Sequence, residues 1–273
     1  MIDAIARLDP FLQAVLAGVF TWAVTALGAA IVLVRRDFPA GALDAMLGFA
    51  AGVMIAASVW SLLIPAIELA EATGVPAWLP ASVGLIFGAG FLRIVDEFLP
   101  HLHLFLPTER AEGLTTTRRH TTLLVLAITL HNVPEGLAMG VAFGAAGVLD
   151  GGAADSALAA AIALAFGIGL QNFPEGIAVA MPLRREGISP FRSFWFGQLS
   201  AVVEPFAAAI GAAAVLRVQA ILPYGLAFAA GAMLFVVVEQ LIPESQQRGR
   251  TDLATSGTII GFVVMMILDV ALS

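Results

Sequence analysis

The chain contains 273 residues, of which 60% are hydrophobic and only 12% are charged, and its mean hydropathy is +0.95. Soluble domains carry about twice that charged fraction, so the composition excludes an ordinary soluble domain. The net charge of −7 and the lack of a basic patch argue against a nucleic-acid partner. Because the chain has no cysteine, disulfide bonds and thiolate metal sites are also excluded.

Apolar segments long enough to cross a lipid bilayer follow one another along the chain. About 20 predominantly apolar residues suffice for a transmembrane helix, and glycine and alanine are abundant in these segments, as expected where membrane helices pack closely. We predict eight spans, at residues 11–34, 45–68, 78–98, 121–143, 157–182, 193–216, 221–243 and 255–272. The predicted fold class is therefore an all-α polytopic membrane protein.

The arginines predict the orientation of these spans, since the chain has no lysine. The odd-numbered loops hold Arg35, Arg36, Arg110, Arg118, Arg119, Arg184, Arg185, Arg192, Arg248 and Arg250, whereas the termini and even-numbered loops hold only Arg7 and Arg217. Positive residues concentrate on the cytoplasmic side, so both termini are expected to face outward. The first apolar segment has full spanning length, which does not suit a cleavable signal peptide.

Two pairs of internal repeats stand out. "LHNVPEGLAMG" (130–140) resembles "LQNFPEGIAVA" (170–180), and "FAAGVMIAASVWSLLIP" (49–65) resembles "FAAGAMLFVVVEQLIP" (228–243). The partners of each pair lie in spans of opposite direction. We therefore predict a single transmembrane transporter domain over residues 1–273, in a 3+2+3 inverted-repeat arrangement in which spans 1–3 match spans 6–8 around spans 4 and 5. Inverted repeats of this kind place binding sites near the membrane midplane.

The repeated motif carries chemistry suited to a metal ion. His131 and Glu135 are four residues apart and share one helix face, where an imidazole and a carboxylate can chelate one divalent ion. A proline inside each motif frees a backbone carbonyl, and a glycine after it allows a neighbouring helix to approach. The candidate ligands are His131, Asn132, Glu135, Gln171, Asn172 and Glu175. This nitrogen and oxygen set favours Zn(II), Fe(II), Mn(II) or Cd(II) over Cu(I).

Further acidic residues lie outside the motif. Glu204 is a carboxylate in the middle of span 6, followed by proline, and is a plausible additional ligand. A path that receives released metal at the cytoplasmic side would comprise Asp96, Glu97, His101, His103 and Glu239, although the same residues could simply be charged helix ends. Arg93 is expected to pair with Asp96 and Glu97 within one helix. Asp44 and Asp269 are expected to be structural or to reach toward the headgroups.

With these motifs, the chain resembles the ZIP (Zrt-, Irt-like protein) family of divalent metal transporters, of the prokaryotic type. The resemblance covers most of the chain and rests on "HNVPEG" and "QNFPEG" in consecutive spans, with support from "FAAGVMIAASVWSLLIPAIE" in span 2. It implies a binuclear metal centre halfway across the membrane. His131, Glu135, Gln171 and Glu175 would hold the principal ion near Met54, while Asn132, Asn172 and Glu204 would complete a second site that shares the two motif carboxylates.

The resemblance also implies function and location. Zinc, or another divalent transition metal, would be the transported substrate, with no organic cofactor and no enzymatic activity, and it would move into the cytoplasm across the bacterial inner membrane. An elevator-like displacement of the central helices against spans 1–3 and 6–8 is implied, and homodimers are common in the family.

Two features depart from the family pattern. Many members carry histidine where this chain has Gln171, so we expect weaker discrimination of Zn(II) from Cd(II) or Fe(II). The loop between spans 3 and 4 is short, with only three histidines, whereas members often carry a long histidine-rich segment there.

Three other functions compete with metal transport. An intramembrane metal-dependent hydrolase could use a metal-bound water, but the His-Glu-x-x-His pattern is absent. A proton- or sodium-coupled carrier of an organic solute would need aromatic or arginine groups, and the central spans supply almost none. A metal-selective channel would use the same ligands, and saturable against linear flux would distinguish it.

Overall fold

The structure is a computed structural model that describes residues 6–98 and 120–272, without the side chains of residues 120–124 and 127. The described residues form helices and include no strand, which confirms the all-α class. Among them, seven helical stretches are long and apolar enough to cross a membrane: Pro10–Val34, Ala40–Ala72, Trp78–Phe98, Gly151–Arg185, Pro190–Arg217, Gln219–Gln246 and Thr251–Leu272. Each overlaps a predicted span. The remaining predicted span, 121–143, falls within α7, a helix of 29 residues.

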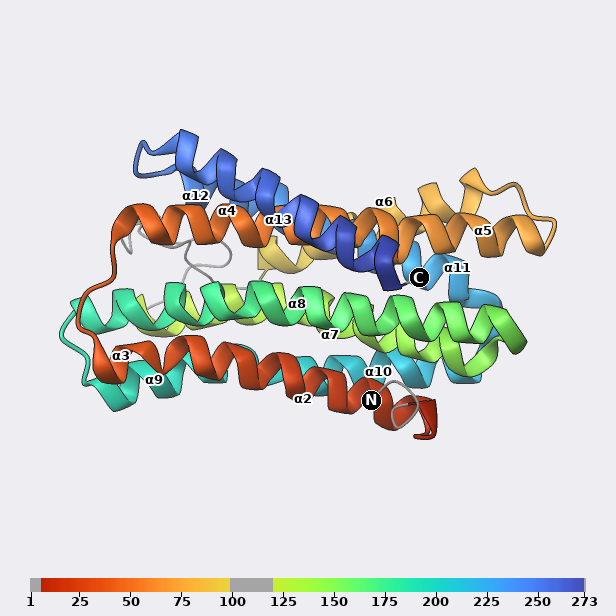
Figure 1. The fold of residues 1–273 in the computed structure, drawn as a ribbon, viewed down its shortest axis with the longest axis horizontal. Coiled ribbons are helices and arrows are strands. Elements are labelled where there is room, and N and C mark those ends of the chain that lie inside the picture. The colour runs from red at the N-terminus through yellow and green to blue at the C-terminus, as the bar shows by residue number, and fades with distance from the viewer. Residues whose placement is uncertain (1–5, 99–119, 273) are drawn as a thin grey trace.

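Most of these stretches are divided into consecutive elements. In chain order the elements are α2 (Pro10–Ala29), α3 (Ile31–Val34), α4 (Ala40–Ala57), η1 (Ser58–Leu63), α5 (Ile64–Ala72), α6 (Trp78–Phe98), α7 (His120–Val148), α8 (Gly151–Arg185), α9 (Pro190–Leu199), α10 (Val203–Arg217), η3 (Gln219–Ile221), α11 (Leu222–Val236), η4 (Val237–Leu241), α12 (Ile242–Gln246) and α13 (Thr251–Leu272). As Figure 1 shows, α2 begins and α13 ends toward the same end of the molecule.

Prolines shape the helices in two ways. Pro134 and Pro174 lie inside α7 and α8, which continue through them. Pro65 and Pro243, in contrast, each lie two residues after the end of a π-helix, η1 and η4 respectively. Because proline has no N–H to donate and its ring crowds the preceding turn, it favours such a widening of the hydrogen-bond ladder. Both π-helices lie in the repeated segments that end in Ile-Pro, and the sequence pattern alone did not predict them.

The helices pack as two groups, with α7 and α8 running through the middle of the molecule (Figure 1). In the first group, which we call the motif bundle, α2 and α10 pack against α8 and α7. In the second group, which we call the flanking bundle, α4 packs on α13 and α6 on α11. Spans 1 and 6 therefore pack with the central spans 4 and 5, whereas the family resemblance implied that only spans 4 and 5 form the central unit.

Glycines explain this grouping. A Cβ atom at Gly136 would lie 2.6 Å from the backbone oxygen of Glu204 on α10, and one at Gly176 would lie 2.7 Å from the backbone nitrogen of Ala29 on α2. Only glycine allows backbones to approach this closely, and such contacts drive helix association in membranes. The expectation that the motif glycines permit close helix approach is confirmed.

Similar contacts hold the flanking bundle together. Gly52 of α4 lies against the backbone of Thr258 on α13, and Gly88 of α6 lies against the backbone of Phe228 on α11. In both helix pairs a small residue on one helix lets the backbone of the other approach closely. Such packing is common in membranes, where the hydrophobic effect does not drive helices together.

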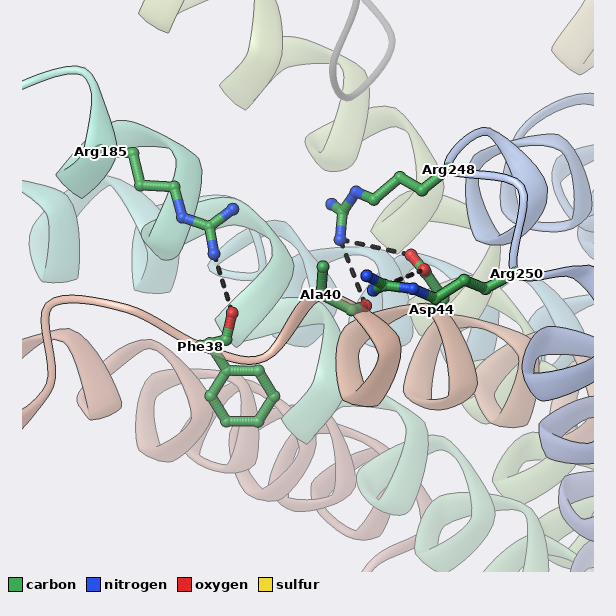
Figure 2. A network of polar contacts seen from close by, with 6 residues as sticks. All are labelled: Phe38, Ala40, Asp44, Arg185, Arg248 and Arg250. Carbon is green, nitrogen blue, oxygen red and sulfur yellow. Dashed lines mark hydrogen bonds and ion pairs between the residues drawn. The ribbon is translucent and has the colours of Figure 1, made fainter.

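A charged network closes one end of the flanking bundle (Figure 2). The carboxylate of Asp44, which is fully buried on α4, lies 3.2 Å from Arg248 and 3.9 Å from Arg250, and both arginines belong to the connection between α12 and α13. Arg248 also donates to the backbone oxygen of Ala40, at 3.4 Å. Burial lowers the pKa of the Arg248 guanidinium, and the carboxylate of Asp44 opposes that shift. The structural role expected of Asp44 is confirmed.

Replacing Asp44 should destabilise the protein strongly. Asp44→Ala removes the fully buried carboxylate that lies 3.2 Å from Arg248, and removal of one partner of a buried ion pair typically costs about 3 kcal/mol or more. Thermal unfolding of the purified protein in lipid nanodiscs should show a clear loss of stability. The matched control is Asp37→Ala, because Asp37 is 80% exposed and 3.7 Å from Arg185, and exposed ion pairs contribute little. Equal losses in the two variants would contradict this assignment.

Candidate metal centre

The motif side chains are buried in the interior of the motif bundle. Asn132, Glu135, Gln171 and Asn172 are fully buried, and His131 and Glu175 are each only 4% exposed. His131 and Glu135 lie one turn apart on α7, and Gln171 and Glu175 have the same spacing on α8, which packs against α7. The structure therefore brings together the polar groups of the two motifs from neighbouring helices.

Five oxygen atoms in this cluster have no hydrogen-bond partner within the part of the chain that the structure describes. They are Oδ1 of Asn132 and Asn172, Oε1 of Gln171, and Oε2 of Glu135 and Glu175. Buried polar atoms are almost always hydrogen-bonded in proteins, and an unsatisfied one typically costs 1–3 kcal/mol. These oxygen atoms lie on two neighbouring helices and could act together as ligands of a cation, which would satisfy them.

The amide nitrogens of these side chains donate hydrogen bonds to neighbouring groups. The amide of Asn132 donates to the backbone oxygen of Ser200 at 3.0 Å, and that of Asn172 donates to Oε1 of Glu204 at 2.8 Å. The amide of Gln171 donates to Oε1 of Glu135. Because each amide nitrogen is engaged, each amide oxygen is left as a potential ligand, in the way that outer contacts orient metal ligands elsewhere.

The carboxylates of the cluster lie near enough to repel one another when they are ionised. Glu135 interacts electrostatically with Glu175 and Glu204, and Glu175 also interacts with Glu244 on α12. Negative groups at membrane depth are costly unless a positive charge or hydrogen bonds compensate them. A divalent cation between Glu135 and Glu175 would supply that charge.

The amides are essential to this interpretation. Within residues 6–98 and 120–272, no three histidine or acidic side chains come together as a metal-binding group. The candidate centre therefore relies on the amide oxygens of Asn132, Gln171 and Asn172 beside the two carboxylates. Amide and carboxylate oxygens are hard ligands, so His131 would be the main group that favours a transition metal over Mg²⁺ or Ca²⁺.

Two further predicted ligands lie on other helices. Met54 is fully buried on α4, the flanking helix that packs against α8. Glu204 is fully buried near the start of α10, and both of its carboxylate oxygens accept hydrogen bonds, one from Asn172 and the other from the hydroxyl of Thr21. Glu204 is thus part of the cluster, but its oxygens differ from the five unpartnered ones.

The predicted release path is only partly described. Asp96 is buried and accepts from Gln240 at 3.5 Å, whereas Glu97 and Glu239 are exposed. Arg93 lies 4.0 Å from Asp96 and 3.9 Å from Glu97, which confirms the expected intrahelical pairs. His101 and His103 lie outside the described residues.

A cavity of about 370 Å³ lies between the two bundles but does not include the predicted ligands. Its lining includes Trp60 from η1, Glu68 from α5 and Ala142 from α7. Ser61 and Asp269 also line it, and the Ser61 hydroxyl donates to Asp269 at 2.7 Å. The structural role expected of Asp269 matches this bond.

The sequence interpretation missed three residues of the cluster. Thr21 contacts Glu204 from α2, Ser200 orients Asn132, and Glu244 interacts with Glu175. Thr21 and Ser200 are single polar residues in apolar segments and belong to no motif. Glu244 does directly follow the repeated Ile-Pro pair, so the second repeat carried a signal for it.

The chain is similar to proteins of one known family. The family model described as ZIP Zinc transporter matches residues 107–269. The chain belongs to the ZIP zinc transporter family. It is 41% identical to "Zinc transporter ZIP11" of Homo sapiens, over 95% of this chain and 97% of that protein. It is also 38% identical to "Zinc transporter GufA" of Myxococcus xanthus (91% and 94%) and to "Zinc transporter ZIPB" of Bordetella bronchiseptica (95% and 81%).

Membership of this family decides between metal transport and the metal-dependent hydrolase. Its members are named as zinc transporters and not as enzymes, so this chain is not an enzyme and the hydrolase hypothesis is set aside. Several apolar helices in the described part of the chain agree with a multi-span membrane protein.

Replacing Gly176, which follows the candidate ligand Glu175, should weaken metal binding. A Cβ atom in Gly176→Ala would displace α8 from α2, because it would lie 2.7 Å from the backbone nitrogen of Ala29. We expect roughly tenfold weaker Zn(II) binding, the lower end of what disturbed ligand support costs, measured by isothermal titration calorimetry. Gly90→Ala is the control, since nothing lies within 4 Å of a Cβ atom there. Unchanged binding in Gly176→Ala would contradict the packing argument.

Proposed function

We propose that this protein is a secondary transporter that moves Zn(II), and with less discrimination Cd(II), Fe(II) or Mn(II), into the cytoplasm. The observation that carries the proposal is the set of five buried, unpartnered oxygens on α7 and α8. A cation that sheds its water needs replacement ligands at membrane depth, and these atoms supply them. The names of the zinc-transporting relatives support zinc as the substrate.

The principal ion is bound by His131, Glu135, Gln171 and Glu175, with Met54 beside it. The two carboxylates balance the charge of one divalent ion, so the loaded site is close to neutral and can be carried through the membrane at low electrostatic cost. Asn132, Asn172 and Glu204 form a second position next to the first, where Glu135 and Glu175 bridge the two ions.

The proposed architecture has eight spans in a 3+2+3 inverted repeat, with both termini outside, in the bacterial inner membrane, and with a homodimer as the candidate assembly. Two matched features of the structure support the repeat: the paired π-helices before Ile-Pro and the close approach of each motif glycine to a different neighbouring helix. The division into two bundles suggests that the motif bundle moves as one body against the flanking bundle. Asp96, Glu97, His101, His103 and Glu239 receive the released ion.

Two alternatives to carrier-type metal transport are less well supported. A carrier of organic solutes would need a roomy central site, but the motif side chains are fully or almost fully buried and do not line the cavity of about 370 Å³. A channel would need a continuous pore past those same residues. Saturable uptake distinguishes a carrier from a channel.

Replacing Glu175 should abolish saturable transport. In proteoliposomes, Zn(II) and Cd(II) uptake by the wild type should saturate, and Glu175→Gln should reduce it to below about one-tenth because a charge-neutralising ligand is lost. Glu71→Gln removes an exposed carboxylate and serves as the matched control with unchanged uptake. Uptake that is linear with concentration in the wild type would support a channel, and full activity of Glu175→Gln would refute the proposed site.

Gln171 should set metal selectivity. In Gln171→His an imidazole replaces a hard amide oxygen, and imidazole favours Zn(II) over hard-ligand competitors. We expect competition by Fe(II) and Mn(II) against Zn(II) uptake to weaken several-fold, as measured with labelled zinc in proteoliposomes. Selectivity identical to that of the wild type would exclude Gln171 as its determinant.

A further inference from the structure

A threonine from outside the two motifs contacts the centre. Thr21 lies in the middle of α2, is fully buried, and its hydroxyl donates to Oε2 of Glu204. The two helices meet closely here, since a Cβ atom at Gly18 would lie 2.7 Å from the Cα atom of Pro205. This glycine allows α2 to approach α10 and places Thr21 against the carboxylate.

Glu204 consequently differs from the other carboxylates of the cluster. Asn172 donates to its Oε1 at 2.8 Å and Thr21 donates to its Oε2, whereas Glu135 and Glu175 each keep one unpartnered oxygen. Because each donor occupies one lone pair of a Glu204 oxygen and draws on its negative charge, a cation that binds Glu204 competes with these two donors. A cation that binds between Glu135 and Glu175 need not displace either. Among the carboxylates of the cluster, Glu135 and Glu175 are therefore open to a cation, whereas Glu204 is already hydrogen-bonded at both oxygens.

The hydroxyl of Thr21 has a second acceptor within reach. The backbone oxygen of Gly18, three residues earlier on the same helix, lies 3.1 Å from it. A hydroxyl has a single hydrogen, which serves one acceptor at a time, and threonine in a helix commonly donates to a carbonyl three or four residues earlier. Thr21 can therefore release Glu204 without leaving its own hydrogen unsatisfied.

We propose that Thr21 is a positioning residue that controls occupancy of the second metal position by competing with the ion for Glu204. The inference rests on the proposed function and deepens it. The first ion binds to the unpartnered oxygens of Glu135 and Glu175. A second ion binds more weakly, because it gains the full charge and both oxygens of Glu204 only when the Thr21 hydroxyl turns to Gly18.

Thr21→Val tests the inference, because valine keeps the shape of threonine and removes the hydroxyl. A hydrogen bond to a charged group contributes enough that its removal should tighten the second ion roughly tenfold and leave the first unchanged. Cd(II) binding to the full chain in nanodiscs, followed by isothermal titration calorimetry and by metal counting after equilibrium dialysis, measures both affinities. Thr21→Ser retains the hydroxyl and should bind as the wild type does.

Thr25→Val is the matched control. Thr25 is also fully buried on α2, and its hydroxyl donates to the backbone oxygen of Thr21 at 3.3 Å rather than to Glu204. A second-ion affinity that is unchanged or weaker in Thr21→Val, or tightened equally in Thr25→Val, overturns the inference while one tightly bound ion leaves the proposed function intact. A wild type that binds no Cd(II) at all refutes the proposed function itself.

Discussion

Buried oxygen atoms without hydrogen-bond partners are the constraint on which the rest of this structure depends. Asn132, Glu135, Gln171, Asn172 and Glu175 each present one such atom inside a bundle of apolar helices. In a membrane no bulk water is at hand to satisfy them, so the arrangement is stable only if another group meets their need. A mobile divalent cation meets it reversibly, and reversibility is what a transporter requires.

The surrounding fold holds these atoms in place through contacts that only small residues allow. Gly136 and Gly176 bring α10 and α2 against the motif helices, and Gly18 brings Thr21 to Glu204. Ser200 and Glu204 then take the amide nitrogens of Asn132 and Asn172, so that the amide oxygens remain available. Glycine packing and ligand orientation are therefore linked. Gly136, for example, lets α10 approach α7, and α10 carries Glu204, which orients the amide of Asn172.

Local patterns in the sequence predicted much of this arrangement. Apolar length located the helices, and the spacing of His131 from Glu135 predicted a shared helix face. The π-helices η1 and η4 were not predicted, although each precedes an Ile-Pro pair. What the sequence could not predict depends on contacts between distant segments: the packing of α2 and α10 with the motif helices, and the ion pair between Asp44 and Arg248, which are 204 positions apart in the chain. Thr21 was missed because one threonine in an apolar helix has no periodic or motif signal.

Anomalous diffraction from crystals soaked with Cd(II) tests the central claim most directly. The account predicts the strongest anomalous peak between α7 and α8, within about 2.2–2.6 Å of oxygens of both Glu135 and Glu175, since hard oxygen ligands bind large divalent ions at such distances. A strongest peak elsewhere, for instance at Asp269 in the cavity between the bundles, with no density at the motif carboxylates, would contradict it.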